Sequence, residues 1–141
     1  MAVVARYLVD KSALARAGHP AVSARLVPLI EAGLVATCAL VDLEVLYSAR
    51  GFEEYERIRT DRAVAYERLP MPDEVWDQAV ATQRELARGG RTRVAGIPDL
   101  LIAATAARAG AAVLHYDADF DAIAEVTRQS VEWVVPRGSA A

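Results

Sequence analysis

Apolar and polar positions follow one another in blocks along the chain, and the blocks predict strands and helices in turn. Continuous apolar runs predict short buried strands over 3–9, 34–38, 111–116 and 131–135. Apolar residues at helical spacing, bounded by glycine, proline or a capping side chain, predict helices over 12–17, 21–32, 39–48, 51–66, 73–87, 98–109 and 120–125. Two of these helices, 39–48 and 98–109, are apolar nearly all round, so we expect them to be buried.

Strands that alternate with helices of ten or more residues are typical of an α/β fold with a mainly parallel sheet. We therefore expect a single domain over residues 1–136, with a central sheet of four to five strands flanked by helices. Residues 137–141 are expected to form a flexible C-terminal tail. Because ligands of such folds bind at the carboxyl ends of the strands, the residues that follow each strand are the first candidates for a site.

Composition narrows the class of protein. The chain has 141 residues, of which 54% are hydrophobic, so it can supply one well-buried core. Its net charge of −3 argues against a protein that coats nucleic acid through charge alone, but an acidic metal site would lower the charge of a nuclease as well. The single cysteine, Cys38, is interpreted as a small core residue of a cytoplasmic protein. No stretch is long and apolar enough to predict a membrane span.

Four carboxylates stand in apolar surroundings, where unpaired charges are rare. Asp10 and Asp117 each follow directly after an apolar strand. Asp99 begins the buried helix after Pro98, and Glu44 lies inside the apolar run 38–47. Neighbouring strands are about 4.8 Å apart, so Asp10 and Asp117 come within reach of one metal ion if their strands are close in the sheet. We expect the four acids to share one site.

Grouping these acids has an electrostatic cost that points to a ligand. Two unit charges about 5 Å apart repel by roughly 3 kcal/mol at an effective dielectric of about 20. A group of four carboxylates must therefore hold protons or bind a cation. A set of oxygen ligands favours Mg²⁺, with Mn²⁺ as a substitute, over zinc, which prefers histidine and cysteine.

Each acid also has a structural interpretation. Asp99 is compatible with an ordinary first-turn helix acid, and Asp10 is placed to cap the turn into the helix that starts at Ser12. Asp119 is expected to be the N-cap of the helix that follows it, with a supporting role behind the metal ligands.

Periodicity leaves two further positions open. Asp42 and Glu44 both have apolar neighbours at helical spacing, so the pattern does not choose between them. His115 shares a strand face with Asp117, because side chains two residues apart point the same way. A strand histidine of this kind is more often a satisfied structural residue than a ligand or a catalytic group, and we favour the structural interpretation.

Three segments in order resemble the motifs of PIN domains, especially those of VapC-type toxin ribonucleases. They are YLVDKSAL over 7–14, PDLLIAATA over 98–106 and LHYDADF over 114–120. The resemblance covers essentially the whole chain, and it implies that Glu44 rather than Asp42 belongs to the site. Lys11 and His115 stand where threonine is common in the family, but neither departure removes an acid.

The resemblance implies a Mg²⁺-dependent endoribonuclease of compact PIN fold. Such a protein cleaves structured RNA, at loops of tRNA or ribosomal RNA, is neutralised by a cognate VapB-type antitoxin, and is often a homodimer. The implied catalytic and metal-binding residues are Asp10, Glu44, Asp99 and Asp117. Ser12 and Asp119 would support them from behind.

Substrate phosphates need cations, and the loop around residues 88–93 supplies them. Arg88, Arg91 and Arg93 are the candidates for RNA contact, although a solvated loop explains them equally well. Three other functions stay open: a receiver-type signalling domain, a PIN nuclease of RNA maturation, and a non-catalytic module that binds RNA or protein. The first is disfavoured, since Asp10 has no acidic neighbour and Asp99 opens a helix.

Overall fold

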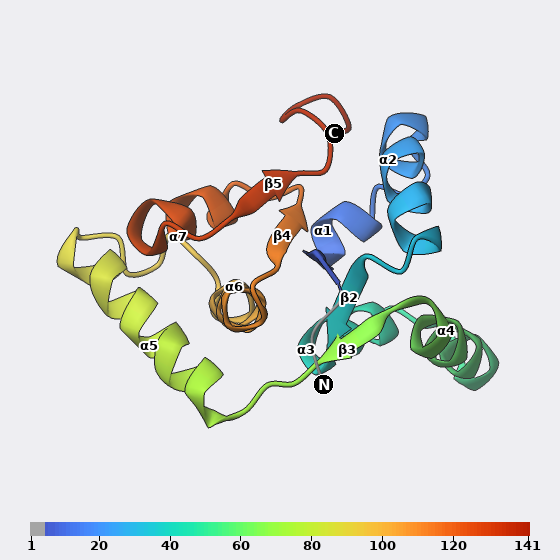
Figure 1. Ribbon diagram of the computed structural model, residues 1–141, viewed down its shortest axis with the longest axis horizontal. Coiled ribbons are helices and arrows are strands. Elements are labelled where there is room, and N and C mark those ends of the chain that lie inside the picture. The colour runs from blue at the N-terminus through green and yellow to red at the C-terminus, as the bar shows by residue number, and fades with distance from the viewer. Residues whose placement is uncertain (1–4) are drawn as a thin grey trace.

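The computed structural model describes residues 5–141, which form one sheet with helices on both faces (Figure 1). The strands are β1 (Tyr7–Val9), β2 (Val35–Cys38), β3 (Glu67–Leu69), β4 (Ala112–His115) and β5 (Val131–Trp133). The helices are α1 (Lys11–Leu14), α2 (Pro20–Glu31), α3 (Ala39–Leu46), α4 (Phe52–Ala65), α5 (Asp73–Arg88), α6 (Ile97–Ala109) and α7 (Asp119–Thr127). The predicted single α/β domain is thus confirmed.

The five strands lie in the order β3-β2-β1-β4-β5, and every pairing between them is parallel. β1 therefore lies at the centre, with β2 on one side and β4 on the other. The chain leaves β1 through α1 and α2 to reach β2, and it returns from β3 through α5 and α6 to reach β4. β2 and β3 are added on one side of β1, whereas β4 and β5 are added on the other, which creates a topological switch point between β1 and β4.

Two apolar clusters hold the layers together. On one face, Leu8 and Val113 of the sheet pack with buried residues of α5, α6 and α7. On the other face, Val9 and Leu114 pack with α1 and α2. Neighbouring residues of one strand thus serve opposite clusters, because successive side chains of a strand point to opposite faces.

α6 is the central helix of the larger cluster. Its residues 100–106 are all buried, which confirms the predicted buried helix and explains why this segment carries so few polar residues. Pro98 stands in its first turn, where a missing N–H is tolerated. Gly110 ends the helix in the left-handed conformation, at φ 70°, a region that favours glycine. The first turn, with Asp99, is thereby fixed beside the carboxyl end of the sheet.

Several sequence predictions need correction. β3 is an edge strand of only three residues, Glu-Arg-Leu, and this pattern did not predict a strand. α3 was expected to be buried all round, but Leu43 is 62% exposed and Tyr47, just beyond the helix, is 90% exposed. The first predicted strand includes residues 3 and 4, which lie outside the described residues. The other predicted boundaries agree with the structure to within about two residues, apart from the first helix, which ends three residues early.

The helix caps agree with the structural interpretation of Asp10 but not with that of Asp119. Asp10 is the N-cap of α1, and its side chain accepts a hydrogen bond from the N–H of Ser12. Asp119 is not the N-cap of α7: Ala118 holds that position, and Asp117 accepts the N–H of Asp119 instead.

The end of the chain lies against α1. The carbonyl oxygen of Ala140 accepts a hydrogen bond from Arg16 Nε at 3.1 Å, and its N–H donates to the hydroxyl of Tyr116 at 2.9 Å. Ala140 is only 4% exposed, in contrast to the flexible tail expected from sequence, because these contacts with Arg16 and Tyr116 hold it. Over residues 5–141, none of the helices is long and apolar enough to cross a bilayer.

Candidate metal centre at the carboxyl edge of the sheet

The acids gather at the switch point of the sheet. Val9 of β1 pairs with Leu114 of β4, and the N–H of Asp10 donates to the carbonyl oxygen of Leu114 at 2.9 Å. Asp10 and Asp117 therefore follow two adjacent parallel strands at the same edge, as the sequence predicts. This is the position at which open α/β sheets bind their ligands.

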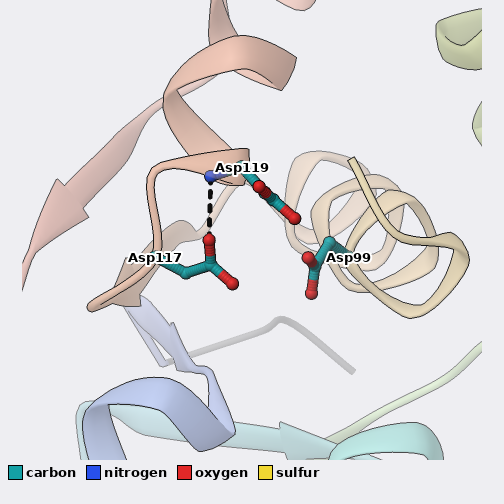
Figure 2. A group of neighbouring side chains, drawn as sticks. All are labelled: Asp99, Asp117 and Asp119. Atoms are coloured by element: carbon teal, nitrogen blue, oxygen red, sulfur yellow. Dashed lines mark hydrogen bonds between the residues drawn. The ribbon is translucent and has the colours of Figure 1, made fainter. Parts of the chain in front are cut away.

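Asp99, Asp117 and Asp119 form the group that best fits a metal ion. One carboxylate oxygen of each lies within 4.8 Å of the others. Figure 2 shows how Asp99, from the first turn of α6, faces the other two, which come from the loop after β4 and the start of α7. Asp117 Oδ1 accepts the N–H of Asp119 at 2.9 Å, which turns the chain so that both carboxylates point to one space.

The electrostatics of this group favour a bound cation or proton. The pKa of Asp99 is raised to about 8, first by burial, then by the charge of Asp10, by a hydrogen bond with Asp119 and by the charge of Asp117. Asp99 thus retains a proton near neutral pH while the group holds no cation. The donors are all carboxylate oxygens, the ligands that Mg²⁺ and Mn²⁺ prefer, so the residues fit such an ion.

Asp10 is a buried residue beside this group, and its side chain and its backbone N–H both form hydrogen bonds. It is 4% exposed, and its Oδ2 accepts the N–H of Ser12 at 2.9 Å. The hydroxyl oxygen of Ser12 in turn accepts the N–H of Tyr116 at 2.8 Å. Ser12 therefore joins the turn after β1 to the turn after β4, and so fixes Asp10 relative to Asp117.

The structure separates Glu44 from its rival Asp42. Asp42 Oδ1 accepts hydrogen bonds from Thr37 Oγ1 at 2.8 Å and from Arg62 Nε at 3.0 Å, so it belongs to a structural network between β2, α3 and α4. The pKa of Glu44 is raised by its own burial and then by the charge of Asp10, which places Glu44 on the side of the acidic site. Asp10 stands outside the three-carboxylate group, but its charge acts both on Asp99 and on Glu44.

His115 supports the site from inside the sheet. Its side chain is fully buried, and its Nδ1 accepts the N–H of Asp117 at 3.1 Å. The centroid of the ring lies 5.0 Å from those of both Phe120 and Trp133, and both ring pairs are tilted. Burial lowers the pKa of His115, so the ring is neutral and carries its proton on Nε2. That atom has no hydrogen-bond partner within residues 5–141.

The predicted RNA-binding arginines lie in and next to the loop between α5 and α6. Arg88 pairs with Glu85 at 3.4 Å, and Arg91 Nη1 pairs with Glu125 at 2.7 Å, so carboxylates already share their charge. Arg93 is exposed. The loop leads directly into the first turn of α6, which carries Asp99.

Two features of the site were not predicted from the sequence. Asp119 belongs to the three-carboxylate group, although the sequence indicated a cap with a supporting role. The spacing Asp-x-Asp directly after a strand is a signal for it, since a tight turn can bring both carboxylates together. Arg16 and Arg137 line a cavity next to Asp117, and no local pattern connects residues so far apart in the chain.

The comparisons with known proteins agree with this fold. Residues 7–126 match the model of the PIN domain, and this chain belongs to the PIN-domain family. Within that family its similarity is to VapC ribonucleases. It is 50% identical to ribonuclease VapC21 of Mycobacterium tuberculosis H37Rv over 96% of this chain and 98% of that protein, and 45% identical to VapC51 of the same strain over 95% and 96%.

Solved structures show the same fold at low sequence identity. VapBC2 from Rickettsia felis, determined with a DNA fragment from its promoter, matches with a TM-score of 0.73 and 20% identity, over 89% of this chain and 96% of that one. The DNA-bound VapBC of Salmonella typhimurium also gives a TM-score of 0.73, at 18% identity, over 93% and 99%.

Proposed function

We propose that the protein is a metal-dependent endoribonuclease and the toxin of a toxin–antitoxin pair. The observation that carries the proposal is the convergence of Asp99, Asp117 and Asp119 within 4.8 Å at the switch point of the sheet. A group of this kind binds a divalent cation through oxygen. High identity to VapC21 and VapC51, both named ribonucleases, supports RNA as the substrate.

The residues that would hold the cation are Asp99, Asp117 and Asp119, with Asp10 and Glu44 adjacent. Compared with the set implied by the resemblance, Asp119 gains a direct role, whereas Asp10 and Glu44 lie outside the three-carboxylate group. When bound, Mg²⁺ would supply positive charge at the scissile phosphate. It would also lower the pKa of a water molecule, so that hydroxide becomes available to attack the phosphorus. Such a hydrolysis leaves 5′-phosphate and 3′-hydroxyl ends.

The chain itself prepares this chemistry. Burial, and then the charge of Asp10, keeps a proton on Asp99 near neutral pH, and Asp99 would have to lose this proton to act as a metal ligand. Ser12 and His115 hold the turns that carry Asp10 and Asp117, so the carboxylates do not have to rearrange before they bind. The site thus holds its carboxylates in fixed positions. Because these carboxylates repel an RNA phosphate, the phosphate could bind here only with a cation between them.

Partners and cellular setting follow from the relatives. The structural neighbours are VapBC complexes, which supports a VapB-type antitoxin as the partner of this chain. We further propose that the substrate is structured RNA cut at a loop of tRNA or ribosomal RNA, that the protein forms a homodimer, and that it acts in the cytoplasm.

The test is cleavage of total cellular RNA by the purified protein with Mg²⁺, with EDTA, and as the Asp99→Asn variant. Discrete fragments that require both Mg²⁺ and Asp99 are expected, and mapping their ends identifies the target. Asp77→Asn is the matched control, since Asp77 is an exposed acid on α5 that makes the same change of charge away from the site. Fragments that end in 2′,3′-cyclic phosphate would contradict the proposed mechanism.

A further inference from the structure

A cavity of about 490 Å³ opens next to the acidic site, on the side of the C-terminal segment. It lies between α1, the turn after β4 and the residues that follow β5. Six of its lining residues matter here: Ser12, Arg16, Tyr116, Asp117, Trp133 and Arg137. Asp117 belongs both to this cavity and to the three-carboxylate group, so the cavity adjoins the acidic site at this residue. We call the cavity the arginine pocket.

Two arginines of the pocket are held in place by aromatic rings. The guanidinium of Arg16 lies 4.3 Å over the ring of Tyr116, and that of Arg137 lies 5.6 Å over the ring of Trp133. The two rings meet edge to face at 5.3 Å. Arg16 is further fixed by hydrogen bonds to the carbonyl oxygens of Ser12 and Ala140. The four side chains thus form a stack, in which the cations lose little freedom when they bind a ligand.

The charges of these arginines are not neutralised by the protein. None of the ion pairs within residues 5–141 includes Arg16 or Arg137. Arg88 and Arg91, in contrast, already contact glutamates. Arginine presents a planar fork of donors that matches a phosphate, and Arg16 and Arg137 keep free donors for one.

We propose that the arginine pocket binds a backbone phosphate of single-stranded RNA next to the phosphate that is cleaved. The proposal rests on the proposed nuclease function. A strand that places one phosphate at the carboxylate group passes Asp117 and brings a neighbouring phosphate to Arg16 and Arg137. The cations of the pocket also offset the repulsion between the RNA and the acids. Arg137 and Arg16 are therefore binding residues, and they do not touch the reacting atoms.

The experiment measures the binding of a fluorescent single-stranded RNA oligonucleotide by anisotropy over a range of salt concentrations. It uses the Asp99→Asn background, in which cleavage is blocked. Arg137→Gln is expected to weaken binding roughly tenfold and to lower the slope of log affinity against log salt by about 0.7. Arg137→Lys keeps the charge and should keep the slope. Arg57→Gln is the matched control, because Arg57 is an exposed arginine on α4. Arg137 is exposed near the chain end, so its replacement leaves the fold intact.

The outcomes separate this proposal from the nuclease function. In the cleaving wild-type background, Arg137→Gln should raise KM by roughly tenfold and change kcat by less than about twofold. An affinity and slope equal to those of Arg57→Gln would overturn the arginine pocket while leaving the nuclease intact. Competition by a poly-aspartate peptide as strong as that by RNA would assign the pocket to an acidic protein segment instead. Failure of the wild-type protein to cleave any RNA would overturn the proposed nuclease function. The salt dependence of RNA binding would still test whether the arginine pocket binds a phosphate.

Discussion

The imidazole of His115 accepts the backbone N–H of Asp117 through Nδ1 at 3.1 Å. The imidazole also packs against the rings of Phe120 and Trp133. His115→Phe would preserve the packing and leave that N–H without a partner, at a cost of about 1–3 kcal/mol. We expect a lower melting temperature and slower RNA cleavage. His115→Asn offers an oxygen near the position of Nδ1, so it should recover cleavage in part. Equal cleavage by both variants would show that the hydrogen bond does not position Asp117.

Asp119 should be as important for metal binding as Asp117. The carboxylates of both lie in the three-carboxylate group, so Asp119→Asn is expected to weaken Mn²⁺ binding by roughly 10- to 100-fold, the range found when metal-supporting carboxylates are lost. Isothermal titration with Mn²⁺ measures this directly. Asp121→Asn is the comparison within the same turn of α7, and it should change Mn²⁺ affinity far less. A normal affinity for Asp119→Asn would exclude Asp119 from the metal site.

The raised pKa of Asp99 makes the metal-free protein less stable as pH rises. Its folded pKa of about 8 lies above the ordinary value of 3.8, so the folded state holds the extra proton and stability falls as pH increases through this window. The lowered pKa of His115 acts oppositely but only below about 6.5. Between pH 7 and 8 we expect a loss on the order of 0.5 kcal/mol after solvent screening.

Urea unfolding in EDTA at several pH values measures this loss of stability. Asp99→Asn should remove the pH dependence between 7 and 8 and stabilise the metal-free protein at pH 8. Saturating Mg²⁺ should also remove it, since the cation takes the place of the proton. A wild-type stability that rises over this range would contradict the assignment of the proton to Asp99.

We expect Asp42 to contribute to the stability of the fold and Glu44 to contribute to RNA cleavage. Arg62 is 9% exposed and binds both Asp42 and Thr37, so Arg62→Met removes the partner of Asp42 and should cost about 1–3 kcal/mol of unfolding free energy. Cleavage below the melting temperature should be unaffected. Glu44→Gln should reduce cleavage by at least tenfold with little change in stability. The reverse pattern would mean that the choice of Glu44 over Asp42 is wrong.

The loop arginines should contribute unequally. Replacing Arg91 and Arg93 together with Ala is expected to weaken RNA cleavage and to leave Mn²⁺ binding intact. Since Arg91 already pairs with Glu125 at 2.7 Å, Arg93→Gln alone should account for most of the loss. The measurement is kcat/KM on one RNA substrate for each single variant. Unchanged cleavage by the double variant would remove this loop from the RNA contact.

Most of the fold and the position of the acids could be predicted because they depend on local patterns. The parallel sheet follows from short apolar runs between helices, and α6 follows from its uninterrupted apolar sequence. Asp10 and Asp117 follow apolar strands directly. In a parallel sheet they must therefore lie together at the carboxyl ends of the strands. β3 was missed because three residues, two of them charged, pair with β2 only in the finished sheet.

Other parts of the site depend on contacts that no local pattern records. The turn in which Asp117 accepts the N–H of Asp119 brings the second carboxylate inward, whereas helix periodicity indicates only a cap. Arg16 and Ala140 are far apart in sequence, and their contact arises because the chain end packs on α1. The charge balance of Arg91 likewise becomes visible only when α7 brings Glu125 beside it.

The order in which the carboxylates occur along the chain has a consequence for synthesis. Asp10 is made early, but Asp99, Asp117 and Asp119 come from the last third of the chain, and the central strand β1 must wait for β4 before its carboxyl edge is complete. At 5–20 residues per second, a ribosome needs roughly 6 to 24 s to pass residue 119. A product that ends before β4 lacks Asp117 and Asp119, so it cannot assemble the three-carboxylate group.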